Sequence, residues 1–248
     1  MKRTPNYLWR KLTALMLCFI MGVSSLTVCY AEASESTEET EASVSAVSVS
    51  LNKSKASVAL EKTVKLKATV SGTSSKVTWS TSKKSVATVS AKGVVKGKKA
   101  GTATITATVD GQTAACTVTV TVDLASYMNG SISKLKKAVG SLKFTSNDPA
   151  PETRKLYIST TGDSNAFFAS VSKSTKKIEL VQNLNRTSVK VYGVSIGNSV
   201  SAAHKKLLKK GFRLSSKASG VRDYKNGTFW IRLFIENSKV TGYWISRL

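Results

Sequence analysis

The chain has 248 residues and a formal net charge of +24, from 38 Lys and Arg against 14 Asp and Glu. A hydrophobic share of 41% with 3 Pro and 15 Gly is typical of one or two globular domains, which excludes collagen-like and wholly disordered proteins. One His and three Cys exclude most His- or Cys-based catalysis and the usual structural zinc sites.

Residues 1–31 have the layout of a secretory signal peptide, with basic residues over 2–11, an apolar run over 12–28 and small residues after it. The run is short and broken by Gly and Ser, which is marginal for a helix that must cross ~30 Å of hydrocarbon. We therefore predict cleavage after Ala31 and no transmembrane segment after signal removal. Retention of the segment as an anchor is the alternative.

Residues 32–45 are rich in Ser, Thr, Ala and Glu and contain no basic residue. This composition predicts a disordered acidic spacer, which either keeps the cleavage site accessible or makes a loose electrostatic contact with the basic remainder. If Cys18 and Cys29 leave with the signal, Cys116 is the only thiol and no internal disulfide can form. An exported chain without disulfides favours a bacterial origin.

Residues 46–123 show the alternation of β-strands. Over 102–109 the Thr side chains share one parity while Ala, Ile and Val share the other, and the pattern recurs over 113–122. Asp110-Gly111 between these runs is a favoured dipeptide of tight hairpins. With five further short runs, the segment predicts an antiparallel sandwich of about seven strands, in which Cys116 is an inert core thiol.

The motifs of this segment resemble the bacterial Ig-like group 2 domain. They are Trp-Ser at 79–80, Val-Ala-Thr-Val at 86–89, Gly-Val-Val at 93–95 and Ala-Gly-Thr-Ala-Thr-Ile-Thr-Ala at 100–107. The resemblance implies a spacer or adhesive module without catalytic residues. We expect Trp79 at the centre of the sandwich, and Gly93, Gly97 and Gly101 at loop positions that need a permissive backbone.

Residues 124–248 predict an α+β domain of two helix-plus-antiparallel-sheet units, over about 124–194 and 195–248. The apolar spacing favours helices over 124–142 and 199–210, each followed by three short strands. The overall fold class is therefore mostly β, an Ig-like sandwich followed by this α+β domain. The second unit is similar to modules of the beta-lactamase inhibitor protein type, which implies a surface that binds another protein.

No constellation of residues predicts a catalytic site, a metal site or a cofactor. His204 lies on the second predicted helix, where a surface or half-buried position needs no partner. Asp148 and Glu152 could flank a site in the loop over 147–154, although a solvated loop is the simpler interpretation. We predict that the protein is not an enzyme, with an unrecognised hydrolase as an alternative.

The lysine excess is spread over both domains: residues 44–123 carry 12 basic and 3 acidic residues, and residues 124–248 carry 22 and 6. The lysine excess is explained either by solubility or by attraction to an anionic cell-wall polymer or an acidic host glycan. Nucleic acid is disfavoured because the chain is exported and Lys predominates over Arg. The candidate ligand-binding residues are basic residues of the second helix and exposed aromatic residues of the last strands: Lys205, Lys206, Lys209, Lys210, Trp230 and Trp244.

These observations predict a secreted or noncovalently surface-associated bacterial protein that binds wall polymer or glycan in adhesion. A protein-binding, inhibitor-type module is the alternative. The ligand is not named by any motif.

Overall fold

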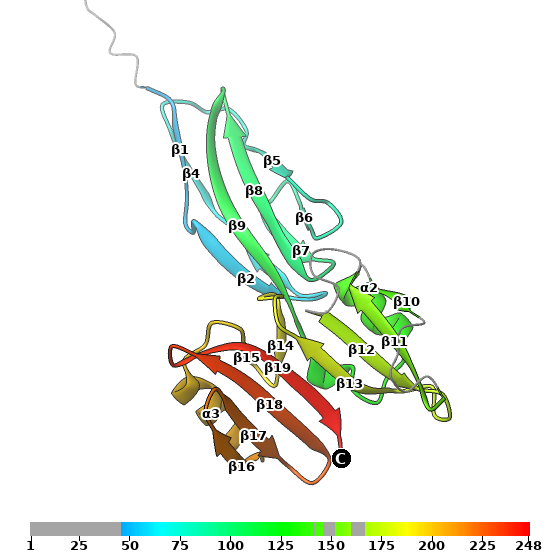
Figure 1. Ribbon diagram of the computed structural model, residues 1–248. Coiled ribbons are helices and arrows are strands. Elements are labelled where there is room, and N and C mark those ends of the chain that lie inside the picture. Colours follow the sequence, from blue (N-terminus) through cyan, green and yellow to red (C-terminus); the bar gives the residue numbers. More distant parts are fainter. Residues whose placement is uncertain (1–45, 141, 146–151, 160–166) are drawn as a thin grey trace, which may run out of the picture. The chain divides into compact units, whose positions relative to one another are not determined.

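The computed structural model describes residues 46–140, 142–145, 152–159 and 167–248 (Figure 1). The predicted signal peptide, its cleavage after Ala31 and the acidic spacer lie outside these residues. The described chain is mostly β, with antiparallel sheets and two α-helices, which confirms the predicted fold class.

Nine strands form the N-terminal sandwich. They are β1 (Ser48–Leu51), β2 (Lys55–Ala59), β3 (Thr63–Lys65), β4 (Ala68–Ser71), β5 (Thr78–Thr81), β6 (Ala87–Val89), β7 (Val94–Gly97), β8 (Gly101–Val109) and β9 (Gln112–Asp123). One sheet contains β5, β8, β9 and β2, the last of these parallel to β9, while β3, β7 and β6 form a second and β1 and β4 pair with each other.

The hairpin of β8 and β9 follows the predicted alternation. Thr102 pairs with Thr119 and Val109 with Gln112, and the turn places Asp110 and Gly111 at φ 45° and 79°. The apolar parity of β9 enters the sandwich core, where Cys116, Val118 and Val120 are fully buried. Cys116 is thus a core thiol, as expected, and burial raises its pKa.

Two expectations for the sandwich differ from the structure. Trp79 is half-buried and packs against the core without filling its centre. Gly93 and Gly101 do have positive φ, but Gly97 does not. A Cβ at Gly97 would lie 2.8 Å from Val120 Cγ1, so the reason for this glycine is close packing between the sheets.

The helix predicted over 124–142 is wrong in its length. A 3-10 turn, η1 (Leu124–Ser126), is followed by a break, and only α2 (Ile132–Val139) is α-helical. Asn129, at φ 64°, breaks the predicted helix before α2 begins, and Gly140, at φ 63°, ends α2. The helix-like spacing of apolar residues continues across this break because Leu124, Met128 and Leu135 are all buried, although only Leu135 lies on α2.

The C-terminal domain is built on one antiparallel sheet of eight strands in the order β10-β11-β12-β13-β19-β18-β17-β16. The strands are β10 (Leu142–Thr145), β11 (Arg154–Ser159), β12 (Phe167–Ser172), β13 (Ile178–Asn183), β16 (Arg213–Ala218), β17 (Val221–Lys225), β18 (Phe229–Glu236) and β19 (Lys239–Arg247). A short hairpin is formed by β14 (Val189–Val191) and β15 (Val194–Ser195), and β14 pairs in parallel with the end of β9, where Val189 lies opposite Val122.

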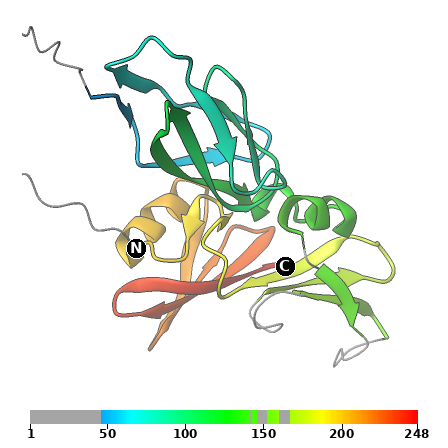
Figure 2. The same cartoon turned by 90° about the horizontal axis from the view of Figure 1, so that it is seen from above.

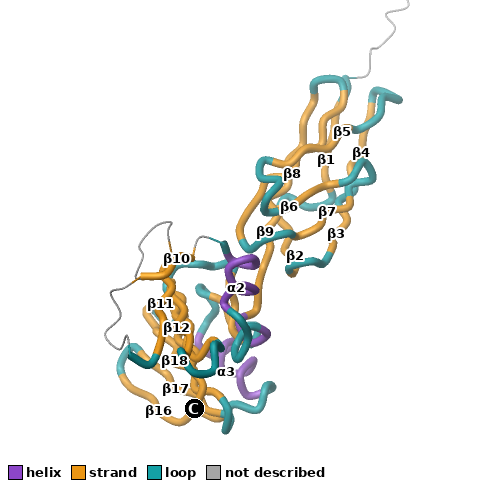
Figure 3. Tube along the Cα trace, turned by 90° about the vertical axis from the view of Figure 1, so that its right-hand side faces the viewer, coloured by secondary structure: helices purple, strands orange, loops and turns teal. Residues whose placement is uncertain are grey.

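The sheet consists of two halves, each a helix followed by four strands. Helix α2 precedes β10 to β13, and α3 (Val200–Leu208) precedes β16 to β19. The halves join where β13 pairs with β19, with Val181 opposite Ile245. Both helices lie on the same side of the sheet, toward its opposite ends (Figures 2 and 3). The sequence pattern predicts three strands in each unit, and β10 and β16 are additional to them.

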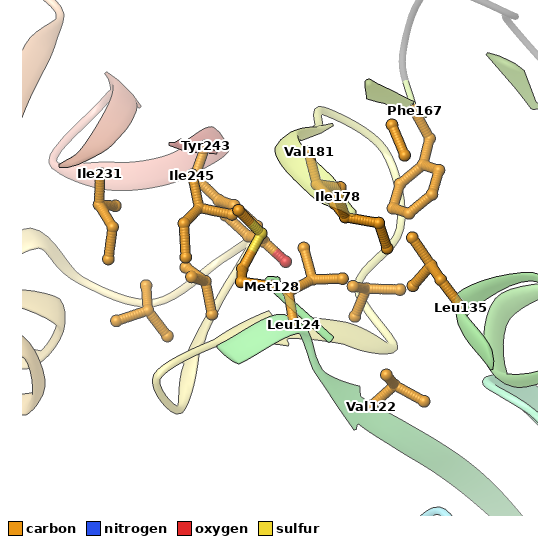
Figure 4. Close-up of a cluster of buried hydrophobic side chains, with 14 of the residues drawn as sticks. Val122, Leu124, Met128, Leu135, Phe167, Ile178, Val181, Ile231, Tyr243 and Ile245 are labelled. Carbon is orange, nitrogen blue, oxygen red and sulfur yellow. The ribbon is translucent and has the colours of Figure 1, made fainter. Parts of the chain in front are cut away.

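The core of this domain lies between the sheet and the two helices. Leu135 of α2 and Leu207 of α3 are fully buried, as are Ile231, Tyr243 and Ile245 of the sheet. Figure 4 shows the side chains of β13 and β19 converging on Leu124 and Met128. Because one face of each strand is committed to this core, the alternate residues must lie on the other face.

Candidate functional site

The face of the eight-stranded sheet opposite the helices carries a group of large side chains. In β18, Ile231 and Leu233 are buried in the core, so Trp230, Arg232 and Phe234 lie on the opposite face. No described helix covers this face. The same alternation in β19 places Tyr243 in the core and Trp244 on the opposite face.

Four of these residues form what we term the aromatic-arginine cluster: Trp230, Arg232, Phe234 and Trp244. The ring centroids of Trp230 and Trp244 are 6.4 Å apart, and those of Phe234 and Trp244 are 5.5 Å apart, both edge to face. The guanidinium carbon of Arg232 lies 4.8 Å from the Trp230 ring centroid and 5.9 Å from that of Trp244. All four side chains are half-buried.

Asp223 of β17 holds the arginine in this position. Arg232 Nε donates to Asp223 Oδ1 at 2.8 Å and Nη2 donates to Oδ2 at 2.9 Å, which is a two-point ion pair across neighbouring strands. The hydrogen bonds to Asp223 raise the pKa of Arg232. The cluster is therefore electrically balanced and fixed in geometry, and its remaining exposed surface is mainly aromatic.

The cluster continues toward the first half of the sheet. The Trp244 indole N–H donates to Gln182 of β13, which is buried and lies opposite Trp244 in the register. On the same face Leu180 pairs with Ser246, and Phe168 of β12 pairs with Gln182. This face thus carries apolar side chains on both sides of the joint between the two halves.

The two sets of predicted ligand-binding residues lie on different surfaces. Trp230 and Trp244 belong to the aromatic-arginine cluster, whereas the predicted lysines lie on or just after α3, on the helix side of the sheet: Lys205, Lys206, Lys209 and Lys210. All four lysines are exposed. Lys206 Nζ donates to the Gly193 carbonyl at 2.9 Å and to Asn198 Oδ1 at 2.7 Å, so this ammonium joins α3 to the preceding loop.

Of the remaining sequence candidates, the structure describes His204 and Glu152. His204 Nδ1 lies 3.1 Å from the Tyr224 hydroxyl on the helix side of the sheet. Glu152 is exposed, and Asp148 with most of the 147–154 loop lies outside the described residues. Within the described ranges no group of three or more His, Cys, Asp or Glu could hold a metal ion, and no helix there is long and apolar enough to span a membrane.

The N-terminal sandwich matches a known domain family. Residues 43–120 match the bacterial Ig-like domain (group 2). This segment is a bacterial Ig-like domain. The match confirms the resemblance seen in the sequence motifs and covers the strands from β1 to most of β9.

Among curated proteins, an α-L-arabinofuranosidase of Bifidobacterium longum subsp. longum is 42% identical over 94 residues. That alignment spans 37% of this chain and only 9% of the enzyme. The chain therefore matches a small part of that protein, and the enzyme's activity does not transfer with it.

Two solved structures are weakly similar to this chain. An intimin mutant of EHEC O157:H7 is 19% identical, with a TM-score of 0.25 over 41% of this chain and 74% of that one. Domains 5–6 of the S-layer protein SbsC are 13% identical, with a TM-score of 0.27 over 81% of this chain and 83% of that one.

Proposed function

We propose that this chain is an exported bacterial protein of the cell surface or extracellular space that acts by binding and has no catalytic role. Support comes from the signal-like layout of residues 1–31 and from the Ig-like domain over 43–120. By resemblance, such domains serve as spacers or adhesive modules. In this proposal the Ig-like domain presents the C-terminal domain, which makes the specific contact.

The single observation that carries the proposal is the aromatic-arginine cluster. Trp and Arg are the residue types that contribute most to binding energy at protein interfaces, and they do so when they are ordered and become fully desolvated. The ion pair with Asp223 orders Arg232, and the edge-to-face contacts order the rings. A half-buried, rigid cluster of this kind loses little conformational entropy when a partner covers it.

The geometry of the cluster favours a protein ligand. The guanidinium of Arg232 covers one face of Trp230 and approaches Trp244. The rings contact each other edge to face, which reduces the flat aromatic surface on which a sugar could stack. An adhesion partner or an inhibited enzyme, engaged through the sheet face, fits this arrangement.

Attraction to an anionic wall polymer or acidic host glycan is the second candidate. The exposed Lys205, Lys209 and Lys210 favour it, because they present ammonium groups on the helix side. Such attraction is diffuse and screened, since the Debye length falls from ~10 Å at about 0.1 M salt to ~3 Å at about 1 M.

One experiment separates the two candidates. The full chain is compared with a cluster variant (Trp230→Ser, Trp244→Ser) and a charge variant (Lys205→Gln, Lys209→Gln, Lys210→Gln). Each is immobilised and tested for stoichiometric capture of secreted proteins and for retention of purified cell walls, at low and high salt. Circular dichroism is used to check that both variants are folded.

The proposal predicts that a protein partner binds stoichiometrically, that this binding persists at high salt, and that only the cluster variant loses it. Truncating a central Trp costs about 2 kcal/mol or more, roughly a thirty-fold loss of affinity. Salt-sensitive wall retention that only the charge variant loses would support the second candidate instead. Failure to bind under every condition, or loss equal in both variants, contradicts the cluster as the binding surface.

A further inference from the structure

The helix side of the sheet holds a cavity of about 540 Å³ beside the start of α3. It is formed by α3, by β16 and β17, and by the turn between β18 and β19. The ring of Tyr224, fully buried, provides its floor, and Leu214, 41% exposed, provides an apolar wall. The volume falls within the ~300–1,000 Å³ typical of small-molecule sites. This cavity and the aromatic-arginine cluster are on opposite faces of the sheet.

The charged residues that line this cavity have one sign. They are Lys217 of β16 and Arg222 of β17, and none of its described lining residues is Asp or Glu. His204 is held against the floor through its contact with the Tyr224 hydroxyl. An anion that enters the cavity would meet two permanent cations and no carboxylate.

Arg222 is positioned by the backbone, and part of its guanidinium is left for a ligand. Its Nη1 donates to the carbonyl oxygens of Ala218 and Val221, at 2.9 and 2.8 Å. Both bonds come from the same nitrogen, so Nη2 and Nε are not used in them. A guanidinium held in this way can offer two parallel donors to a carboxylate or a phosphate.

The cavity also has hydroxyl groups, which distinguish it from a plain basic patch. Ser201 on the first turn of α3 and Ser238 in the β18–β19 turn also line it. The Val200 backbone N–H donates to the Ser238 carbonyl at 3.0 Å, which fixes the turn against the helix. Cations, hydroxyls and an apolar wall together match a sugar ring that carries an acidic group.

We propose that this cavity binds a hydroxylated organic anion, a sugar acid or a sugar phosphate. Arg222 and Lys217 bind its anionic group, the serine hydroxyls bind its hydroxyls, and its ring packs on Leu214. A sugar acid and a sugar phosphate share the same chemistry, an anionic group on a polar ring, and differ in the geometry of the anionic group.

The only histidine of the chain gives a direct readout. The full chain, made without a histidine tag, is titrated with glucuronate, with glucose 6-phosphate and with neutral glucose, at constant pH and ionic strength. The imidazole proton resonances of His204 are followed by NMR. Lys217→Gln and Arg222→Gln test the cavity. Lys143→Gln and Lys177→Gln remove the same charge outside it, at exposed positions in the first half of the sheet.

We expect saturable shifts of the His204 resonances with one or both anions and none with glucose. The anion that binds more tightly identifies the acidic group. Each cavity variant weakens binding about five-fold or more, as expected for a lost ion pair at a half-exposed site, while the control variants change it less than two-fold. Lys217 is exposed, so its variant remains informative if Arg222→Gln does not fold.

Three results would overturn the proposal. They are the absence of saturation with either anion, equal shifts with glucose, and equal loss of affinity in the control and cavity variants. None of these depends on whether the aromatic-arginine cluster binds a protein, so the two proposals fail separately.

Discussion

Asp123, at the end of β9, is expected to be one of the polar residues on which the stability of the C-terminal domain most depends. Its Oδ1 accepts from the backbone N–H of Ala125 at 3.1 Å and of Tyr192 at 2.8 Å, and its Oδ2 accepts from the N–H of Gly193 at 2.7 Å. One carboxylate therefore begins the η1 turn and also holds the β14–β15 hairpin, almost seventy residues later in the chain.

The cost of Asp123→Ala follows from these bonds. Loss of the cap at Ala125 costs about 1 kcal/mol. Each of the other two N–H groups loses a charged acceptor. We take the cost of each loss as about 1 kcal/mol, at the low end for a charged acceptor, because Asp123 is half-buried. The free energy of unfolding falls by about 3 kcal/mol. Asp123→Asn keeps Oδ1 but turns an NH₂ group toward the Gly193 N–H, so it costs about half as much.

Native-state hydrogen exchange with peptide mass spectrometry measures this loss in the C-terminal domain separately from the Ig-like domain. Protection in β12, β13 and β19 should fall roughly 100-fold in Asp123→Ala. Asp110→Asn is the control, because Asp110 is exposed at a hairpin tip and Asn tolerates its positive φ. A loss below ten-fold, or no larger than that of the control, would refute the reasoning.

Three further predictions concern the two cores. Gly97→Ala should lower the free energy of unfolding by about 1–3 kcal/mol, seen as a lower melting temperature of the Ig-like domain, because the added Cβ meets Val120; an unchanged melting temperature contradicts this. Cys116 should resist alkylation in the native protein, because burial raises its thiol pKa, and react on unfolding; peptide mapping checks this, and native labelling is the opposing result. Burial also raises the pKa of Tyr243, so the unfolded phenol ionises above pH ~10 while the folded one does not, and stability falls as pH rises. In Tyr243→Phe the urea midpoint should fall less steeply above pH ~10, and equal slopes would argue against this cause.

The sequence predicted those strands whose alternation is strict. The Thr parity of β8 and β9 and the Asp110-Gly111 turn define a hairpin that needs no tertiary information. Strand β16 was missed because all of its residues are exposed at the edge of the sheet, so no apolar parity marks it. The long helix over 124–142 was wrong because spacings of three and four also arise when a turn and a short helix face the same core.

The candidate sites were predicted only in part. Because adjacent side chains of a strand face opposite sides, one residue of Phe229–Trp230 and one of Tyr243–Trp244 had to leave the core. The sequence did not bring Trp230 and Trp244 together, which the structure does. Their association with Arg232 and Asp223 depends on the register between β17 and β18, which local sequence does not specify. The cavity by His204 brings together three segments, around residues 200, 220 and 238, and the short apolar and basic patterns there gave no signal of their meeting.

The place of β19 in the sheet has a consequence for biosynthesis. Strands β10 to β13 are all synthesised before residue 184, yet β13 has no neighbour on its outer side until residues 239–247 emerge. Strand β18 waits for the same segment. A nascent chain that lacks β19 therefore exposes two open strand edges at once, each able to pair with another molecule. The solubility of the newly made domain therefore depends on the synthesis of these nine residues and on their pairing with β13 and β18.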